Sequence, residues 1–338
     1  MDTNLGSHSY VKLKNIKFHY VECGNKQAPL IFLLHGFPDC WFSWQYQLPE
    51  LSKYYHCIAV DLKGFGESDK PINKNLYSIN TIIEELEEFI TIILIKKYAN
   101  NTKNKSIILI GHDLGAILSW YLIYNKNINI SKFISISSIH PNEYITNLIN
   151  TTGNIFNIKW LYITQLPYII ESDIIYNDLN IIDLIYKHYN NNINIITAYK
   201  YCFKRFNDWI GPLNYFRNIP YIKINNNIHT NNTNINTDEL THQIYINTLF
   251  IVGNKDPFIQ LDSIIKSTNY CGYKFLIKII DNAEHFPHQQ YPKECNDIIF
   301  NFHITGVRDS SVANLMWEAE KGDKDKVVRY YLSAIQSE

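Results

Sequence analysis

The segment Gly111-His112-Asp113-Leu114-Gly115 could hold a carboxylate in a reactive position. It joins an apolar run, KSIILI, to a helical pattern, ILSWYLIY. Small residues on both sides of a central acid allow a sharp strand-to-helix turn that lifts its side chain above a sheet. The alternative is an ordinary turn in which Asp113 caps the helix. The first interpretation makes Asp113 a nucleophile.

Two further ionisable residues follow strand-like runs later in the chain. Asp256 comes after NTLFIVG, and His285 comes after the run YKFLIKII. The order nucleophile, acid, base is one that occurs where a nucleophile stands at the top of a parallel sheet. We therefore expect Asp113, Asp256 and His285 to form a catalytic triad.

Backbone donors for this triad are expected at two places. His35-Gly36-Phe37-Pro38 follows the apolar run LIFLL, and Leu114 follows the nucleophile. The N–H groups of Phe37 and Leu114 would converge on a developing oxyanion. His35 and Pro38 are expected to line the pocket.

An aspartate nucleophile restricts the chemistry. Attack of a carboxylate on an acyl group gives a reactive anhydride, whereas attack on an sp³ carbon gives a stable alkyl ester. His285 would then activate the water that hydrolyses the ester, and Asp256 would fix the histidine tautomer. The leaving group would be an epoxide oxygen or a halide.

Four segments resemble motifs of the epoxide hydrolase branch of the α/β-hydrolases: HGFPDCWFSWQYQLPEL, DLKGFGESDKP, GHDLGA and GPLNYFRN. The resemblance extends from about Leu30 to Phe302. It implies that Asp113 is the nucleophile, His285 the base and Asp256 its orienting acid. It also implies conversion of a small apolar epoxide to a diol without a cofactor or metal.

The same resemblance implies two cap tyrosines that protonate the departing alkoxide. Trp160 and Phe216 occupy those positions, where they are expected to line the pocket. Tyr162 and Tyr215 lie nearby and are candidate donors. On a helix, Tyr162 would point about 200° away from Trp160, and Tyr215 about 100° away from Phe216. Either tyrosine could therefore act only if the local backbone shifts register or is not helical.

Three functions remain open at this stage. Epoxide hydrolysis is the leading hypothesis. A haloalkane dehalogenase or another hydrolase on the same scaffold is the second, although Leu114 stands where the family usually has a halide-binding tryptophan. The third is a ligand-binding relative that has lost turnover with both cap tyrosines.

The elements that must position these residues alternate between apolar strands and helices. This pattern predicts an α/β-hydrolase fold, with a mainly parallel sheet and helices on both faces. We expect core residues 8–141 and 248–305, interrupted by a helical cap at 142–247 with an Asn-rich insertion. Residues 306–338 are expected to form a helical tail, with a partial ankyrin-like repeat as the alternative.

Composition excludes several other classes of protein. The formal charge of −1 offers no broad field for nucleic acid. Six scattered cysteines show no metal-ligand spacing. We expect a cytoplasmic protein, because no secretory leader and no membrane-spanning segment stand out. Oligomeric state stays open.

Overall fold

The computed structural model describes residues 5–99, 102, 105–144, 164–189, 192–218, 242–259, 261–305 and 315–317. Its sheet has the order β1-β2-β4-β3-β5-β6-β7-β8-β9. The strands are β1 Ser7–Lys12, β2 Lys17–Cys23, β3 Leu30–Leu34, β4 His56–Val60, β5 Ile107–His112, β6 Ile130–Ile136, β7 Asn247–Gly253, β8 Phe275–Ile280 and β9 Leu315–Trp317.

The helices alternate with these strands along the chain. They are α1 Leu48–Leu51, α2 Ile79–Tyr98, α3 Leu114–Asn125, α6 Ile169–Tyr176, α7 Asn180–Ile185, α8 Ile193–Cys202, α9 Asn207–Asn218, α10 Leu261–Ser267, α11 Pro287–Gln290 and α12 Pro292–Thr305. Short 3₁₀ turns are η1 Trp41–Trp44, η2 Lys74–Tyr77, η3 Lys187–Tyr189 and η5 Thr268–Tyr270.

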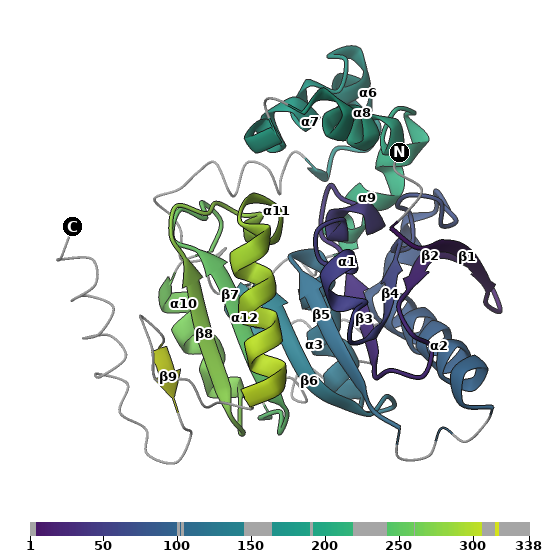
Figure 1. Cartoon of the computed structure of the whole chain (residues 1–338). Coiled ribbons are helices and arrows are strands. Elements are labelled where there is room, and N and C mark those ends of the chain that lie inside the picture. The colour runs from purple at the N-terminus through teal and green to yellow at the C-terminus, as the bar shows by residue number, and fades with distance from the viewer. Residues whose placement is uncertain are drawn as a thin grey trace, which may run out of the picture.

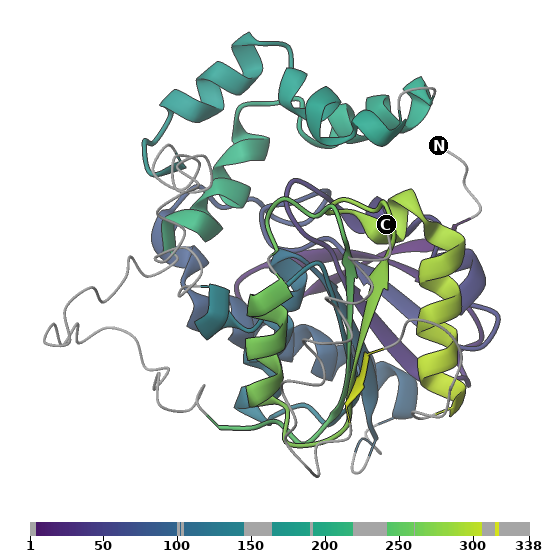
Figure 2. The same ribbon diagram turned by 90° about the vertical axis from the view of Figure 1, so that its left-hand side faces the viewer.

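The central strands are buried on both faces, which explains their continuous apolar runs. In β3, Phe32 packs into one core and its neighbours Ile31 and Leu33 pack into the other. Helices α1 and α12 cover one face, whereas α2, α3 and α10 cover the other (Figures 1 and 2). The predicted fold class is confirmed.

The strand order reverses beside β3, because β4 lies on one side of it and β5 on the other. Strands β3 to β8 run parallel, so their carboxyl ends share one edge of the sheet. Such reversals leave a crevice at that edge. The residues predicted to react follow β3, β5, β7 and β8, and therefore lie around this edge.

Helices α6 to α9 stand above that edge as a cap between β6 and β7 (Figures 1 and 2). A buried ion pair joins two of them, with Arg217 Nη1 2.8 Å from Glu171 Oε1. The described part of the predicted cap is thus helical. The Asn-rich insertion lies outside the described residues, and the domain boundaries stay a prediction.

The prediction of a helical tail at 306–338 is wrong at the three tail residues that the structure describes. Leu315–Trp317, within the predicted helical tail, form β9 and pair antiparallel with β8. The outer edge of β8 presents backbone donors and acceptors that a further strand can bind. The rest of the tail, with the suggested partial ankyrin-like repeat, lies outside the described residues.

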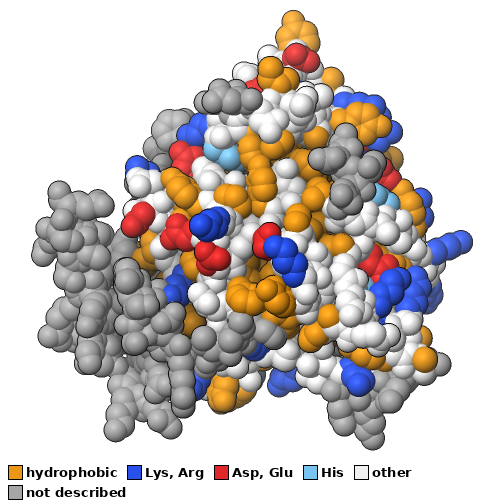
Figure 3. Space-filling model, viewed as in Figure 1, with side chains coloured by type: hydrophobic (Ala, Val, Ile, Leu, Met, Phe, Trp, Pro, Cys, Tyr) orange, Lys and Arg blue, Asp and Glu red, His pale blue; other side chains and the backbone are white. Residues whose placement is uncertain are grey.

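The surface of the face in Figure 3 mixes acidic, basic and hydrophobic side chains. Blue and red groups are interspersed over it, in keeping with the formal charge of −1. Among the residues that the structure describes, no helix has the length and apolar character needed to cross a membrane.

Candidate active site

The turn between β5 and α3 holds Asp113 in a strained conformation. Its φ is 47° and its ψ is −116°, values that non-glycine residues rarely adopt. The Asp113 N–H donates to the Ile136 carbonyl at 3.0 Å, which anchors the turn on β6. The side chain makes no cap hydrogen bond to α3, so the helix-capping alternative is not what the structure shows.

Glycines make this turn possible by close packing. A Cβ at Gly115 would lie 2.2 Å from the Leu34 carbonyl oxygen, and one at Gly111 would lie 2.5 Å from the Ala116 Cα. Both neighbours are backbone atoms and cannot rotate away. The elbow is therefore pressed directly onto β3, which brings the nucleophile to the oxyanion loop.

Gly115→Ala is expected to lower the free energy of unfolding by about 3 kcal/mol, because the new methyl group overlaps backbone. Gly272→Ala is the matched control, since its Cβ would meet side-chain atoms of Tyr245 and Gln243. The outer atoms of these exposed side chains can move aside, but Gln243 Cβ at 2.9 Å can shift only a little, so a smaller loss of about 1 kcal/mol is expected. Urea denaturation measures both, and equal losses would contradict the argument.

The Asp113 carboxylate is held between a backbone donor and a histidine. Oδ2 accepts a hydrogen bond from the Phe37 N–H at 3.0 Å. Oδ1 lies 3.7 Å from His285 Nε2. Gly36 leaves room for this approach, because a Cβ there would lie 2.9 Å from Asp113 Oδ2. The side chain of Asp113 is 24% exposed, so a reactant can reach it.

Asp256 orients the histidine from the other side. His285 Nδ1 lies 2.9 Å from Asp256 Oδ2 and 3.1 Å from Oδ1. Oδ1 also accepts from the backbone N–H of Phe258 at 2.9 Å, which fixes the carboxylate. With Nδ1–H pointed at Asp256, Nε2 faces the nucleophile. The three residues predicted from strand ends are brought together.

The charges of this cluster reinforce one another. Burial by itself would raise the pKa of Asp113, but His285 and the Phe37 N–H outweigh it and lower that pKa to about 2. Burial by itself would lower the pKa of His285, but the charges of Asp256 and Asp113 raise it to about 10. Both shifts favour the charged forms of Asp113 and His285, so the two groups stabilise each other.

The oxyanion loop after β3 is fixed by buried contacts. His35 accepts the Leu62 N–H at Nε2, 3.1 Å away, and donates from Nδ1 to the Gly36 carbonyl at 2.8 Å. His35 is fully buried, so its role is to hold the loop. The Pro38 carbonyl accepts from the cap residue Tyr186 at 2.8 Å. Leu114 begins α3, where helix N–H groups lack intrahelical acceptors.

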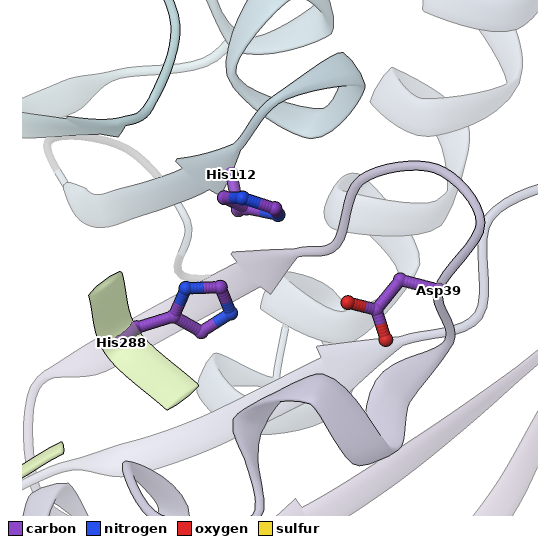
Figure 4. A group of neighbouring side chains, drawn as sticks. All are labelled: Asp39, His112 and His288. Atoms are coloured by element: carbon purple, nitrogen blue, oxygen red, sulfur yellow. The ribbon is translucent and has the colours of Figure 1, made fainter. Parts of the chain in front are cut away.

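A buried polar layer lies beneath the nucleophile. Asp39, His112 and His288 have ligand atoms within 4.8 Å of one another and point toward a common space (Figure 4). His112 donates from Nε2 to the His285 carbonyl at 2.9 Å. Gln289 donates to Asp39 Oδ2 at 2.9 Å. The layer thus joins the oxyanion loop, β5 and α11.

Burial shifts the pKa values of this layer toward the neutral forms of its groups. Burial raises the pKa of Asp39 to about 7 and lowers the pKa of His112 to about 4. Within the described residues, these three form the group whose donor atoms suit a cation. The Asp39 oxygens already accept from Gln289 and from the Cys40 N–H, so we interpret the layer as support for the loop.

The cap residues near the nucleophile differ from expectation in one respect. The ring of Phe216 packs edge-on against Phe37, with centroids 4.9 Å apart, and its expected place in the pocket stays a prediction. Tyr215 is buried and donates its hydroxyl to the Lys63 carbonyl at 3.0 Å. Successive helix residues point about 100° apart, so only one of the pair faces the site. The expectation that Tyr215 donates the proton is corrected; Trp160 and Tyr162 lie outside the described residues.

Tyr144 is a residue that the sequence reasoning missed. It ends the short helical turn after β6, and its N–H donates to the His140 carbonyl at 2.9 Å. Burial first, and then the negative charge of Asp113, raise the pKa of its phenol. Tyr144 therefore lies within electrostatic reach of the nucleophile. The sequence feature that could have identified Tyr144 is its position just after the carboxyl end of a parallel strand.

Comparisons with known proteins identify the family and the fold. A family model described as the alpha/beta hydrolase fold matches residues 29–290. Epoxide hydrolase 4 of Homo sapiens is 28% identical over 313 residues, covering 89% of this chain and 80% of that protein. Epoxide hydrolase 3 of Xenopus tropicalis is 28% identical over 309 residues, covering 88% and 78%.

Solved structures share the fold at lower identity. The structure of potato (Solanum tuberosum) epoxide hydrolase I has a TM-score of 0.72 and 20% identity, covering 88% of this chain and 99% of that one. Epoxide hydrolase A from Mycobacterium thermoresistibile has a TM-score of 0.72 and 19% identity, covering 89% and 99%.

Proposed function

The chain belongs to the alpha/beta hydrolase fold family and is an epoxide hydrolase-like hydrolase, and we propose that it converts a small apolar epoxide to a diol through an ester on Asp113. The observation that carries this proposal is a carboxylate at the elbow, held by the Phe37 N–H and facing His285 Nε2. An ionised, partly exposed carboxylate suits attack on an sp³ carbon.

In the first step an Asp113 oxygen attacks an epoxide carbon. A C–O bond to the enzyme forms, the ring C–O bond breaks, and the ring oxygen leaves as an alkoxide that takes a proton. The low pKa of Asp113 keeps the nucleophile ionised at neutral pH. The product is an alkyl ester, which is stable until water attacks it.

In the second step His285 becomes the base. Esterification removes the charge of Asp113, one of the charges that raise the pKa of His285. Its pKa therefore falls, and Nε2 gives up its proton, which replaces the proton that the alkoxide took from its donor. Nε2 then accepts a proton from water as the water attacks the ester carbonyl. The N–H groups of Phe37 and Leu114 would stabilise the oxyanion. Collapse breaks the ester C–O bond, and the departing alkoxide takes a proton from His285 to give the diol. The carboxylic acid of Asp113 then returns its proton to His285 and is again a carboxylate.

The proposal is tested with a labelled aryl epoxide and detection of diol. A single turnover in heavy-oxygen water distinguishes the ester route, because the first diol keeps an enzyme oxygen and the label enters Asp113. Label that appears in the first diol would contradict the ester. Halide release from halogenated substrates would favour dehalogenation, and tight binding without product would favour a ligand-binding relative.

Tyr144 is the donor that we assign to the alkoxide. It follows β6, which holds the Asp113 N–H through the Ile136 carbonyl, and its raised pKa keeps the phenol protonated until a stronger base develops. Tyr144→Phe is expected to lower the rate of ester formation by about 10²–10³, the usual cost of one donor that acts in the transition state. Rapid-quench measurement of the ester checks this.

Tyr121→Phe is the control for this prediction. Burial alone raises the pKa of Tyr121, to about 12, and no charge of Asp113 contributes. Its loss should leave ester formation within about twofold of wild type. Equal effects of the two changes would contradict the role of Tyr144.

A further inference from the structure

Two thiols meet across the boundary between core and cap. Cys40 Sγ lies 3.5 Å from Cys202 Sγ, although the residues are 162 positions apart. Cys40 follows the oxyanion loop and begins η1, whereas Cys202 ends α8 of the cap. Both are free thiols. We propose that they form an oxidation site whose disulfide latches the cap to the oxyanion loop.

The surrounding contacts hold the two sulfurs in place. On the core side, the Cys40 N–H donates to Asp39 at 2.9 Å. From the cap, Tyr186 donates to the Pro38 carbonyl, and Tyr199 contacts Phe42 with ring centroids 5.8 Å apart. The sulfurs are already in van der Waals contact, and bond formation must bring them about 1.5 Å closer, to a disulfide length of about 2.05 Å.

The two cysteines have different access to an oxidant. Cys40 is 1% exposed, whereas Cys202 is partly exposed. The hydrogen bond with Cys202, followed by burial, raises the pKa of the Cys40 thiol well above its ordinary value. Cys202 therefore reacts first, and Cys40 resolves the product.

Hydrogen peroxide supplies the oxidant. The Cys202 sulfur attacks one peroxide oxygen, the O–O bond breaks, and the thiol proton leaves with hydroxide as water. The Cys40 sulfur then attacks the Cys202 sulfenic acid. The S–S bond forms, the S–O bond breaks, and the hydroxide takes the Cys40 proton as a second water. Two thiols are oxidised and one peroxide is reduced.

The consequence follows from where the bond would lie. Cys40 is three residues from Phe37, whose N–H holds Asp113. Caps that cover active sites commonly shift during binding and release. Tying α8 to this loop would therefore slow turnover, by about three- to tenfold, until a reductant restores the thiols. Only this effect on turnover rests on the proposed function.

The decisive experiment treats the full-length protein with peroxide and maps its peptides without reduction. A linked Cys40–Cys202 peptide is expected, together with slower hydrogen exchange in 193–218, and both should reverse with dithiothreitol. Cys202→Ser, or Cys202→Ala if the serine variant folds poorly, should lack both effects. Neither readout uses an epoxide, so the latch and the proposed reaction fail separately.

Cys23 and Cys57 provide a matched control pair. They stand directly opposite each other on β2 and β4 within the core, so a bond between them would leave the cap free. Cys23→Ser should keep the Cys40–Cys202 link and its exchange effect. The proposal is overturned if only the Cys23–Cys57 link forms, or if the Cys40–Cys202 link leaves hydrogen exchange unchanged.

Discussion

Asp113→Asn is expected to reduce the rate of diol formation by about 10⁴-fold or more, because an amide cannot form the alkyl ester. The change keeps the shape of the side chain and its acceptor for the Phe37 N–H. Loss of activity would therefore report on the nucleophile and leave the elbow intact. Steady-state diol production against wild type measures the effect.

The same variant should change the titration of His285. In the wild-type protein the charges of Asp256 and Asp113 overcome burial and raise the pKa of His285 to about 10. Removing the charge of Asp113 lowers this pKa toward the ordinary 6.5. Histidine ring resonances followed by NMR across pH would show the shift. An unchanged pKa would mean that Asp113 and His285 are not coupled.

Stability should depend on pH in a matching way. The raised pKa of His285 stabilises the fold fully below pH 6.5, and this contribution is lost as pH rises through about 10. The lowered pKa of Asp113 stabilises the fold above pH 3.8, and this contribution is lost as pH falls toward about 2. Asp113→Asn should therefore lower the free energy of unfolding most between pH 3.8 and pH 6.5.

Asp281→Asn serves as the control for the measurements of turnover and of the His285 pKa. Asp281 follows β8 near the same edge of the sheet, but it is exposed and bonded to Asn254. Its replacement should leave turnover and the pKa of His285 close to wild type. A comparable loss of activity in this control would indicate a general effect of charge at that edge.

The sequence predicted the position of site residues that follow parallel strands better than the position of residues that meet through long-range packing. Asp113, Asp256 and His285 each follow an apolar run, and parallel strands bring such positions to one edge. Their convergence was thus a consequence of topology. The doubly wound fold was readable for the same reason, since β3 to β8 carry apolar side chains toward both faces.

Long-range packing hid the remaining features. Asp39 and Gln289 are 250 residues apart, and no periodicity links them to His112. Tyr215 was an attractive donor by proximity in sequence, but helix α9 turns its hydroxyl toward Lys63. The contact between Cys40 and Cys202 depends on how the cap docks, which spacing does not reveal.

His285→Gln is expected to stop the reaction after the first step and trap the ester. Losing His285 raises the pKa of Asp113, but the Phe37 donor remains and the ionised fraction of the carboxylate still attacks the epoxide. Glutamine cannot take a proton from water, so hydrolysis of the ester should fall by about 10³-fold or more. Mass spectrometry should find about one substrate adduct per protein, on the peptide that contains Asp113.

The adduct also separates the competing functions. His242→Gln, a change at an exposed histidine, should turn over normally and accumulate nothing. Asp113→Asn combined with His285→Gln should form no adduct. If His285→Gln binds the aryl epoxide without a covalent product, the carboxylate does not attack carbon and a ligand-binding function is favoured. The ester forms before the base is needed. Its accumulation in His285→Gln would therefore show that Asp113 attacks the epoxide and that His285 is needed only to hydrolyse the ester.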